Sequence, residues 1–286
     1  MNVGIVILHY KTYEDTIVCT KSFLNNKNNN KCEIVIVDNY SNNDSLEVLL
    51  NEFKNQNNVH IISTDYNMGY AKGNNFGAQY LKKLNIDFDY VIFCNNDTYI
   101  KDDMFFEKIL TSIKENKCGV LGPDIIRIQD NIHQNPLKTP KWNKFSINKK
   151  IIEYSIKIII LKIVPFIVNM KNKKSNNTKK REEQGNIIQK NVCLHGAALI
   201  FSKSYLEKFE NVFYDKTFLY LEEDILYLRC KKNNIRMIYD NTIKIYHNHS
   251  SSTKSIYKDE VKRKKFFLKN QISSFKVLKK YLKKGE

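Results

Sequence analysis

The sequence Tyr90-Val-Ile-Phe-Cys-Asn-Asn-Asp97 is an apolar run that stops abruptly at two amides and a carboxylate. Its first four residues are β-prone and predict a buried strand. In an open α/β sheet, ligands bind beyond the carboxyl ends of the strands, which is where Asn96 and Asp97 would lie. A carboxylate there can hold a hard cation, and the cation can hold phosphate. The plainer alternative is a polar turn that binds nothing.

Strands and helices alternate on both sides of this run through the first half of the chain. Continuous apolar stretches, typical of strands buried on both faces, occur at 3–8, 33–37, 59–62 and 90–93. Helical patterns fall between and after them, at 13–23, 41–53, 72–84 and 102–114. We expect Ser41 to cap the second of these helices. This alternation predicts an α/β fold with a doubly wound, mostly parallel sheet flanked by helices.

The pattern is less regular in the second half. Residues 119–128 predict one or two short strands, and 131–190 are irregular except for an apolar segment at 151–170. Charges at Glu153, Lys157 and Lys162 argue against a bilayer span there, so this segment is either a helix touching a membrane surface or an ordinary subdomain helix. Residues 171–183 predict a polar loop.

Regular structure is predicted again from residue 192 onward. We expect a strand within 193–201, helices at 203–209 and 218–232, and strands at 236–239 and 243–246. Residues 257–284 predict a basic helix with apolar residues among its lysines. This helix either lies on anionic lipid or packs on the domain with a solvated basic face.

Length and composition limit the possible classes of protein. A chain of 286 residues can form one large domain, or one domain with an appendage. Its 47 Lys and Arg against 30 Asp and Glu give a net charge of +17, which favours nucleic acid, anionic lipid or phosphorylated substrates. The six cysteines form no CxxC pair, so we expect buried, reduced thiols in a cytosolic protein. The amino terminus does not have the pattern of a signal peptide.

Two groups of polar residues belong to the first half of the predicted sheet. Asp38 ends the second strand, where a carboxylate can accept a hydrogen bond from a base or a ribose; a simple turn is the alternative. Gly69, Gly73 and Gly77 recur at intervals of four residues, which fits neither a dinucleotide fingerprint nor a P-loop. They would still place Lys72 and backbone amides near an anion, unless they serve only for close packing.

Two further groups belong to the second half. Glu222, Glu223 and Asp224 follow a run of aromatic and apolar residues. Acids suit a helix amino terminus, but crowding of this kind can also raise a pKa towards the working range of a general base. His247 and His249 follow the last predicted strand, and one of them would face the site, where a His and a distant Asp can share a metal.

The order of these motifs resembles that of inverting glycosyltransferases of family 2 with the GT-A fold. The likeness is strongest to the bacterial rhamnosyltransferase-like branch that builds surface polysaccharides. It runs from residue 3 to about residue 253, and its order is specific although each motif is weak alone. The motifs are the opening strand, Val37-Asp-Asn-x-Ser, Asn67-x-Gly-Tyr-Ala-x-Gly-Asn-Asn-x-Gly77, Asn95-Asn-Asp97, His195-Gly-Ala, the Glu-Glu block with Arg229, and the His-rich turn.

The resemblance implies a GT-A domain over 1–255 and a basic C-terminal helix over 256–286. Within the domain it implies a Rossmann-like, nucleotide-sugar-binding half at 1–124, a variable insert at 125–190 and an acceptor or catalytic half at 191–255.

The resemblance also implies roles for particular residues. Glu223 would be the catalytic base, with Glu222 and Asp224 as alternatives. Asp97 and His247 would bind a divalent cation, Mn²⁺ or Mg²⁺, with His249 as the alternative to His247. Asn95 stands where the family has a first metal-binding acid. The nucleotide-sugar would be bound by His9, Asp38, Asn67, Lys72, Asn75, Asn96 and Asp97.

The implied reaction moves a sugar from a UDP- or dTDP-sugar, rhamnose being one candidate, to a hydroxyl of a glycan or lipid-linked glycan with inversion. Such reactions build capsule or O-antigen polysaccharides. We therefore expect a cytoplasmic enzyme with peripheral contact to the anionic inner face of the cell membrane, and no nucleic-acid partner. Two alternatives stay open. One is a nucleotidyltransferase, although residues 9–12 contain no glycine. The other is a basic nucleic-acid-binding protein, although no signature of one is present.

Overall fold

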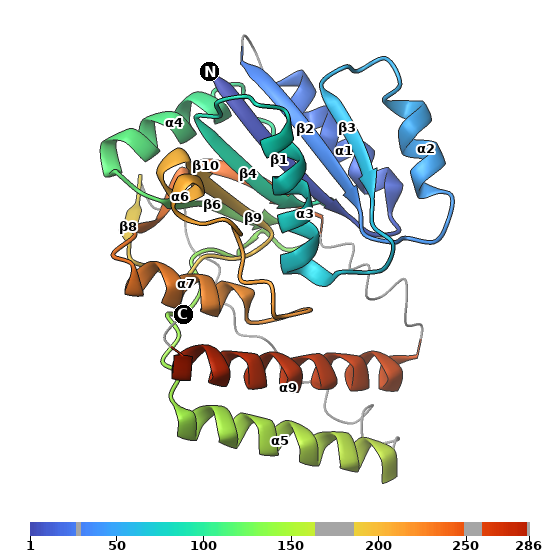
Figure 1. The fold of residues 1–286 in the computed structure, drawn as a ribbon, viewed down its shortest axis with the longest axis vertical. Helices are drawn as coiled ribbons and strands as arrows, with labels where there is room; N and C mark the ends of the chain where they lie inside the picture. The colour runs from blue at the N-terminus through green and yellow to red at the C-terminus, as the bar shows by residue number, and fades with distance from the viewer. Residues whose placement is uncertain (27–29, 164–185, 249–258, 285–286) are drawn as a thin grey trace.

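The computed structural model describes residues 1–26, 30–163, 186–248 and 259–284. Ten strands form one sheet with helices on both faces (Figure 1). The strands are β1 (Asn2–His9), β2 (Lys31–Asp38), β3 (Val59–Ser63), β4 (Tyr90–Asn95), β5 (Thr98–Tyr99), β6 (Val120–Arg127), β7 (Ile132–His133), β8 (Ile188–Lys190), β9 (Ala198–Ser202) and β10 (Met237–His247). The helices are α1 (Tyr13–Asn25), α2 (Ser45–Glu52), α3 (Gly69–Lys83), α4 (Phe105–Asn116), α5 (Lys144–Ile163), α6 (Lys203–Lys208), α7 (Glu222–Lys232) and α9 (Glu260–Lys284).

The strand order is β3-β2-β1-β4-β9-β6-β10-β5, with β7 beside β6 and β8 beside β10. The long neighbours β1, β2, β3 and β4 are parallel, as are β6 and β10. The short strands β5, β7, β8 and β9 pair antiparallel. The predicted α/β fold with a largely parallel sheet is therefore confirmed.

Apolar side chains are buried on both faces of the sheet, which explains the continuous apolar runs in the strands. On β1, Ile5 and Ile7 join the core beneath α1 and α4, whereas Val6 joins the core beneath α3, α6 and α7. All six cysteines are free and buried, as expected. None of the described helices is long and apolar enough to cross a bilayer.

Helices α5 and α9 form a further layer outside the sheet (Figure 1). Ile147 of α5 and Phe275 and Leu278 of α9 share a small core with Leu221 and Ile225 around the start of α7. The segment 257–284 thus packs on the domain from Glu260 onward, one of the two arrangements predicted for it. The predicted loop at 171–183, part of the predicted segment 151–170, and His249 lie outside the described residues.

Several predicted boundaries were wrong. Helix α2 begins at Ser45 and not at Ser41, because the Ser41 hydroxyl and amide both donate to Asp38 Oδ1. Helix α7 begins at Glu222, four residues later than predicted. The two strands predicted after it are one strand, β10, with an irregularity between Asp240 and Lys244.

Candidate active site

The predicted polar strand ends meet at one edge of the sheet. His9 ends β1 and lies level with Asp38, which ends β2. On the other side of β1, β4 ends at Asn95. His247 ends β10 and pairs with the residue that directly follows Asp97. The topology therefore brings together residues that lie more than two hundred positions apart in the chain.

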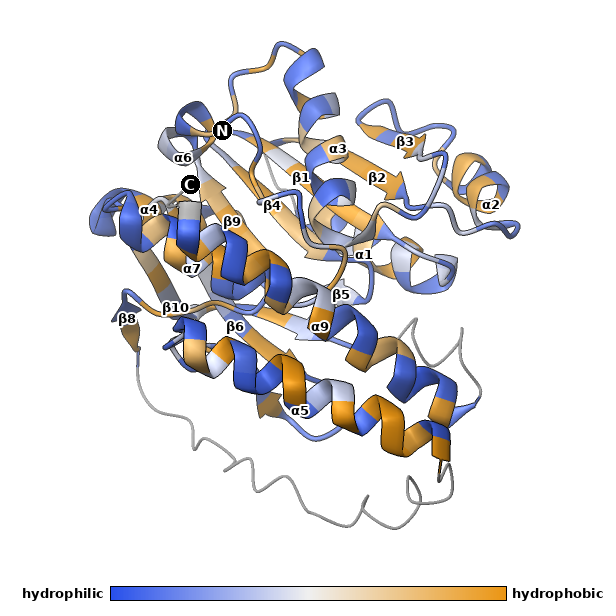
Figure 2. Ribbon diagram, turned by 60° about the horizontal axis from the view of Figure 1, so that its bottom comes forward, coloured by the Kyte–Doolittle hydropathy of each residue, from blue (hydrophilic) through white to orange (hydrophobic). Residues whose placement is uncertain are grey.

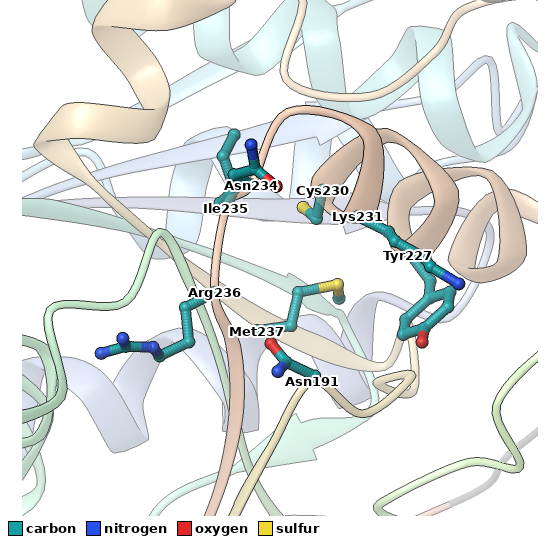
Figure 3. A pocket seen from close by; sticks show the side chains of 8 residues that line it. All are labelled: Asn191, Tyr227, Cys230, Lys231, Asn234, Ile235, Arg236 and Met237. Carbon is teal, nitrogen blue, oxygen red and sulfur yellow. The ribbon is translucent and has the colours of Figure 1, made fainter.

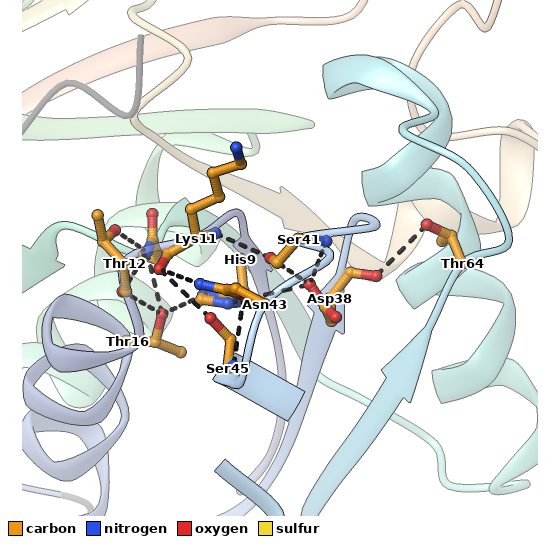
Figure 4. A network of polar contacts seen from close by, with 10 residues as sticks. His9, Lys11, Thr12, Thr16, Asp38, Ser41, Asn43, Ser45 and Thr64 are labelled. Carbon is orange, nitrogen blue, oxygen red and sulfur yellow. Dashed lines mark hydrogen bonds and ion pairs between the residues drawn. The ribbon is translucent and has the colours of Figure 1, made fainter. Parts of the chain in front are cut away.

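His9 and Asp38 form the centre of a buried polar network (Figure 4). The Thr16 hydroxyl donates to the Thr12 carbonyl, so its oxygen accepts the hydrogen bond from His9 Nδ1 at 2.6 Å. His9 Nε2 then carries no proton; it lies 3.9 Å from Asp38 Oδ1 and has no hydrogen-bond partner in the described part of the chain. Burial lowers the pKa of His9 to about 4, although the Asp38 charge opposes this, so the ring is neutral near pH 7.

Asn96 fixes the loop between β1 and α1. Its side-chain amide donates to the Thr12 carbonyl at 3.0 Å, to Thr12 Oγ1 at 2.9 Å and to Thr16 Oγ1 at 3.0 Å. Asn96 is itself buried. The side chain of Asn96 therefore fixes the loop that borders the site. The carboxylate of the next residue, Asp97, is turned towards β10.

Asn39 and Asn67 join the end of β2 to the start of α3. Asn39 Oδ1 accepts from the Met68 amide at 2.8 Å, and Asn39 Nδ2 donates to the Gly69 carbonyl at 3.2 Å. Asn67 Oδ1 accepts from the Gly69 amide at 2.9 Å. These bonds start α3 at Gly69, three residues before the predicted start. Lys72 consequently lies in the first turn of a helix, and its side chain is exposed.

Asn75 occupies a different place from the other predicted ligands. Its amide donates to the Phe213 carbonyl at 2.8 Å and accepts from the Phe213 amide at 2.9 Å. Asn75 is buried and both ends of its side chain are used in this way. The arrangement ties α3 to the loop before α7, and it lends no support to the nucleotide contact predicted for Asn75.

Asp97 and His247 lie side by side as predicted. Gln134 Oε1 accepts from His247 Nδ1 at 2.7 Å, so His247 Nε2 presents a lone pair when the ring is neutral. That nitrogen is 3.2 Å from Asp97 Oδ1, a buried oxygen that accepts no hydrogen bond from the described residues. Two electron-pair acceptors this close repel each other unless a proton or a cation lies beside them. The pair therefore suits a divalent cation, with the His fixed by an outer partner.

Asp97 and His247 are two donors, fewer than a divalent cation takes. Within the described ranges, no group of three or more His, Cys, Asp and Glu residues is arranged to hold a metal ion. A cation at Asp97 and His247 would take its other ligands from elsewhere, and phosphate oxygens are suitable ones.

Glu223 lies beside the His195-Gly196 turn that leads into β9. Its Oε1 accepts from the Gly196 amide at 3.2 Å, and Tyr70 Oη donates to the Gly196 carbonyl at 2.6 Å. The rings of His195 and His247 stand edge to face, with centroids 6.2 Å apart. One short turn thus links Glu223 to the Asp97 and His247 pair.

The three adjacent acids have different surroundings. Burial raises the pKa of Glu223, and Asp224 adds to the shift. Burial, with the Glu223 charge adding to it, raises the pKa of Glu222 to about 8. Asp224 accepts a hydrogen bond from Trp142 Nε1, which points it towards α5 and α9. Glu223 is the acid of the three that bonds to the β9 turn.

A strained turn delivers these acids. Tyr220 and Leu221, directly before α7, both have left-handed backbone angles, with φ of 74° and 68°. Bulky residues rarely adopt such angles, and they concentrate at functional sites. The turn is clamped from the other side, because the Tyr70 amide donates to the Phe218 carbonyl at 2.9 Å. Gly69, with φ of 75°, passes so close that a Cβ there would lie 2.1 Å from that carbonyl oxygen.

A pocket of about 370 Å³ lies between α7 and the start of β10 (Figure 3). Met237, which lines it, is the first residue of β10 and pairs with Val120 at the start of β6. The pocket is therefore at the opposite edge of the sheet from Asp97 and His247. It contains none of the predicted site residues.

Sequence reasoning gave no role to Asn39, Gln134, His195 or Trp142, which all touch the site. Asn39 and His195 belong to recognised motifs, and that membership could have identified them as candidate site residues. Gln134 and Trp142 come from the segment 125–190, where the sequence carries no motif.

Comparisons with known proteins bear on the family and the fold of the chain. The family model described as Glycosyl transferase family 2 matches residues 4–209. No curated protein matches the sequence.

Solved structures of S. aureus TarS resemble the chain. TarS 1–349 has a TM-score of 0.54 at 15% identity, covering 87% of this chain and 60% of that one. Its complex with UDP gives 0.54 and 15%, covering 94% and 65%. Its complex with UDP-GlcNAc gives 0.52 and 14%, covering 88% and 60%. The chain thus spans less than two thirds of the length of these structures, and identities this low show a shared fold alone.

Proposed function

Because the chain belongs to glycosyl transferase family 2, we propose that it transfers a sugar from a nucleotide-diphosphate sugar to an acceptor hydroxyl with inversion of configuration. The GT-A fold expected from the resemblance is the fold of the chain. The observation that carries the proposal is the placement of Glu223. It accepts a hydrogen bond from Gly196 at the same sheet edge as Asp97 and His247, and burial raises its pKa.

In the proposed reaction, Glu223 takes the proton from the acceptor hydroxyl. The hydroxyl oxygen forms a bond to the anomeric carbon on the face opposite the diphosphate, while the bond from that carbon to the diphosphate oxygen breaks. The electron pair leaves with the nucleoside diphosphate, and Glu223 keeps the proton. A raised pKa suits this step, because a carboxylate of ordinary pKa is too weak a base near pH 7. Glu222 and Asp224 remain the alternative bases.

Asp97 and His247 would hold the divalent cation, Mn²⁺ or Mg²⁺. When bound, it would neutralise the negative charge that builds on the departing diphosphate. Asp97 Oδ1, which accepts no hydrogen bond from the described residues, and the lone pair of His247 Nε2 fit such an ion. Asn95, where the family has an acid, leaves the shell short of one protein ligand, so the diphosphate would complete it.

Asp38 would contact the base of the donor, and His9, Asn67, Lys72 and Asn96 would contribute to the same nucleotide site. The two TarS complexes contain UDP and UDP-GlcNAc, which supports a UDP-sugar for this chain. A dTDP-sugar, dTDP-rhamnose among them, is the other donor proposed. Lys72 is exposed in the first turn of α3, where its charge can attract the diphosphate.

The proposed acceptor is a glycan or a lipid-linked glycan, in the synthesis of capsule or O-antigen polysaccharide. The net charge of +17 suits both an anionic donor and peripheral contact with the anionic inner face of the cell membrane. We accordingly propose a cytoplasmic enzyme that works at that surface.

A Glu223→Gln variant tests the base. We expect transfer to fall by about 10²–10⁴-fold, the usual contribution of general-base catalysis, while donor binding stays close to wild type. The matched variant Glu222→Gln is expected to lose much less, because Glu222 makes no bond to the Gly196 turn. Retention of more than about a tenth of the rate by Glu223→Gln would show that another group is the base.

A thermal-shift panel tests donor and cation apart from turnover. Nucleoside diphosphates and nucleotide-sugars, each with and without Mn²⁺, should raise the melting temperature only when they bind the folded protein. We expect Mn²⁺ to enlarge the shift in wild type but not in an Asp97→Asn variant. Transfer that continues undiminished in EDTA would rule out the cation role. Steeply salt-sensitive binding to random DNA without any nucleotide-sugar turnover would favour the nucleic-acid alternative, and turnover of a nucleoside triphosphate would favour a nucleotidyltransferase.

A further inference from the structure

Helix α5 carries apolar residues on two opposite sides. Its inner side packs on α9, where Ile147 and Leu161 are buried and Tyr154 contacts the ring of Phe275. This side accounts for the role of α5 in the fold. The remaining apolar residues of the helix are the ones that need a different explanation.

The outer side of α5 is exposed and apolar. Counting from Ile152, its isoleucines recur at i+4, i+7, i+8 and i+11, which places them on one stripe of a helix. Each is between 41% and 73% exposed, and Phe145, two turns earlier on the same stripe, is 78% exposed. Together these residues define the outer α5 face, which consists of Phe145, Ile152, Ile156, Ile159, Ile160 and Ile163.

The rim of this face is basic. Helix α5 contains five lysines and a single acid, Glu153, which is held in ion pairs by Lys150 and Lys157. Lys162 is exposed along one edge of the stripe and Lys157 along the other, whereas Lys149 is exposed within the stripe, one turn after Phe145. The neighbouring α9 contains ten basic residues and one acid. An apolar stripe bordered by cations on both sides matches an anionic lipid surface, in which acyl chains lie beneath negative headgroups.

The outer α5 face is also correctly placed for such a surface. Among the described elements, helix α5 is the outermost layer, with α9 between it and the sheet (Figure 1). The apolar residues are visible along it towards its carboxyl end (Figure 2). Helix α9 in turn packs on Leu221, two residues before Glu223.

We propose that the outer α5 face binds the surface of an anionic bilayer, with the helix lying in the plane of the interface. From Phe145 to Ile163 the stripe is about 27 Å long at 1.5 Å per residue, so it offers a large contact. A second copy of the chain is a poorer occupant, because pairing two outer α5 faces would bring two basic rims together. This inference deepens the proposed membrane contact by naming its surface. It rests on the proposed function only in that a lipid-linked acceptor would lie at the same surface.

Vesicle co-sedimentation of the full chain, without nucleotide-sugar, tests the inference separately from the proposed function. Wild type should bind vesicles of phosphatidylcholine with phosphatidylglycerol and bind phosphatidylcholine alone much more weakly. The double variant Ile156→Asp/Ile159→Asp should lose at least about tenfold in affinity for the anionic vesicles. The matched control is Val18→Asp/Leu50→Asp on α1 and α2, because those side chains are 55% and 50% exposed and the charge change is the same. The control should bind like wild type.

Three results would overturn the inference. The first is no binding of wild type to anionic vesicles, and the second is equal loss in the α5 and control variants. The third is a wild-type dimer, measured by light scattering, that only the α5 variant dissociates, without vesicle binding by either protein. Transfer to a soluble acceptor should be unchanged in the α5 variant. Failure of that reaction in wild type would count against the proposed function and leave the vesicle result standing.

Discussion

Replacing Gly69 by alanine is expected to destabilise the protein by about 2–5 kcal/mol and to slow the reaction. At φ of 75° an alanine costs about 1–2 kcal/mol more than glycine. The new Cβ would lie 2.1 Å from the Phe218 carbonyl oxygen, which is backbone and must therefore move. Moving it breaks the 2.9 Å hydrogen bond from the Tyr70 amide, and an unpaired buried amide costs about 1–3 kcal/mol. The displaced turn leads directly into Glu223.

Urea unfolding at pH 7 measures the first effect, and transfer by the folded variant measures the second. Gly73→Ala is the matched control, since that Cβ would meet the end of a flexible side chain, Leu8 Cδ1, and alanine favours the helix. We expect Gly73→Ala to change the free energy of unfolding much less. If Gly69→Ala stays within about 0.5 kcal/mol of wild type, the ordinary range of a surface change, the close approach to Phe218 is wrong.

Three further predictions concern the rest of the site and its support. Because burial raises the pKa of Glu222 from 4.5 to about 8, the folded state holds more protons than the unfolded state across that window. Wild-type stability should therefore fall as pH rises through it, and Glu222→Gln should reduce that fall by a few kcal/mol at about 1.4 kcal/mol per pKa unit, measured by urea unfolding at several pH values. Phe275→Ala should cost about 3–5 kcal/mol and shift the fluorescence of Trp142, whose ring it contacts. Gln134→Leu should weaken Mn²⁺ binding in a thermal-shift titration by about 10–100-fold and lower stability by about 1–3 kcal/mol, because the buried Nδ1 of His247 loses its acceptor.

The strands were predictable from the sequence because their burial on two faces leaves a local trace. β1 and β4 appear in the sequence as continuous apolar runs. The polar residues at their ends are equally apparent, because they interrupt those runs. Helix starts were less predictable, because distant side chains set them. The side chains of Asn39 and Asn67 hydrogen-bond to the backbone of Gly69, where α3 begins. The sequence of residues 69–72 by itself does not predict this start.

The site divides along the same line. Asp97 and His247 were paired by a resemblance of motifs, and the structure places them 3.2 Å apart. The outer partner of His247, Gln134, lies in a segment with no motif and arrives there through β6 and β7. Asn75 is the opposite case. It belongs to a recognised motif, but both ends of its side-chain amide hydrogen-bond to the backbone of Phe213.

The packing of α5 on α9 also bears on how the protein is made. Helix α5 ends at Ile163, and its partner α9 begins at Glu260, about a hundred residues later. At about 5–20 residues per second, a ribosome needs on the order of ten seconds to reach the end of α9 after completing α5. Throughout that interval the inner apolar side of α5 is not covered by α9. The nascent chain therefore exposes the apolar residues of α5 early, and those of its inner side are buried only when α9 has been made. We expect α5 to be a segment that a chaperone binds during translation.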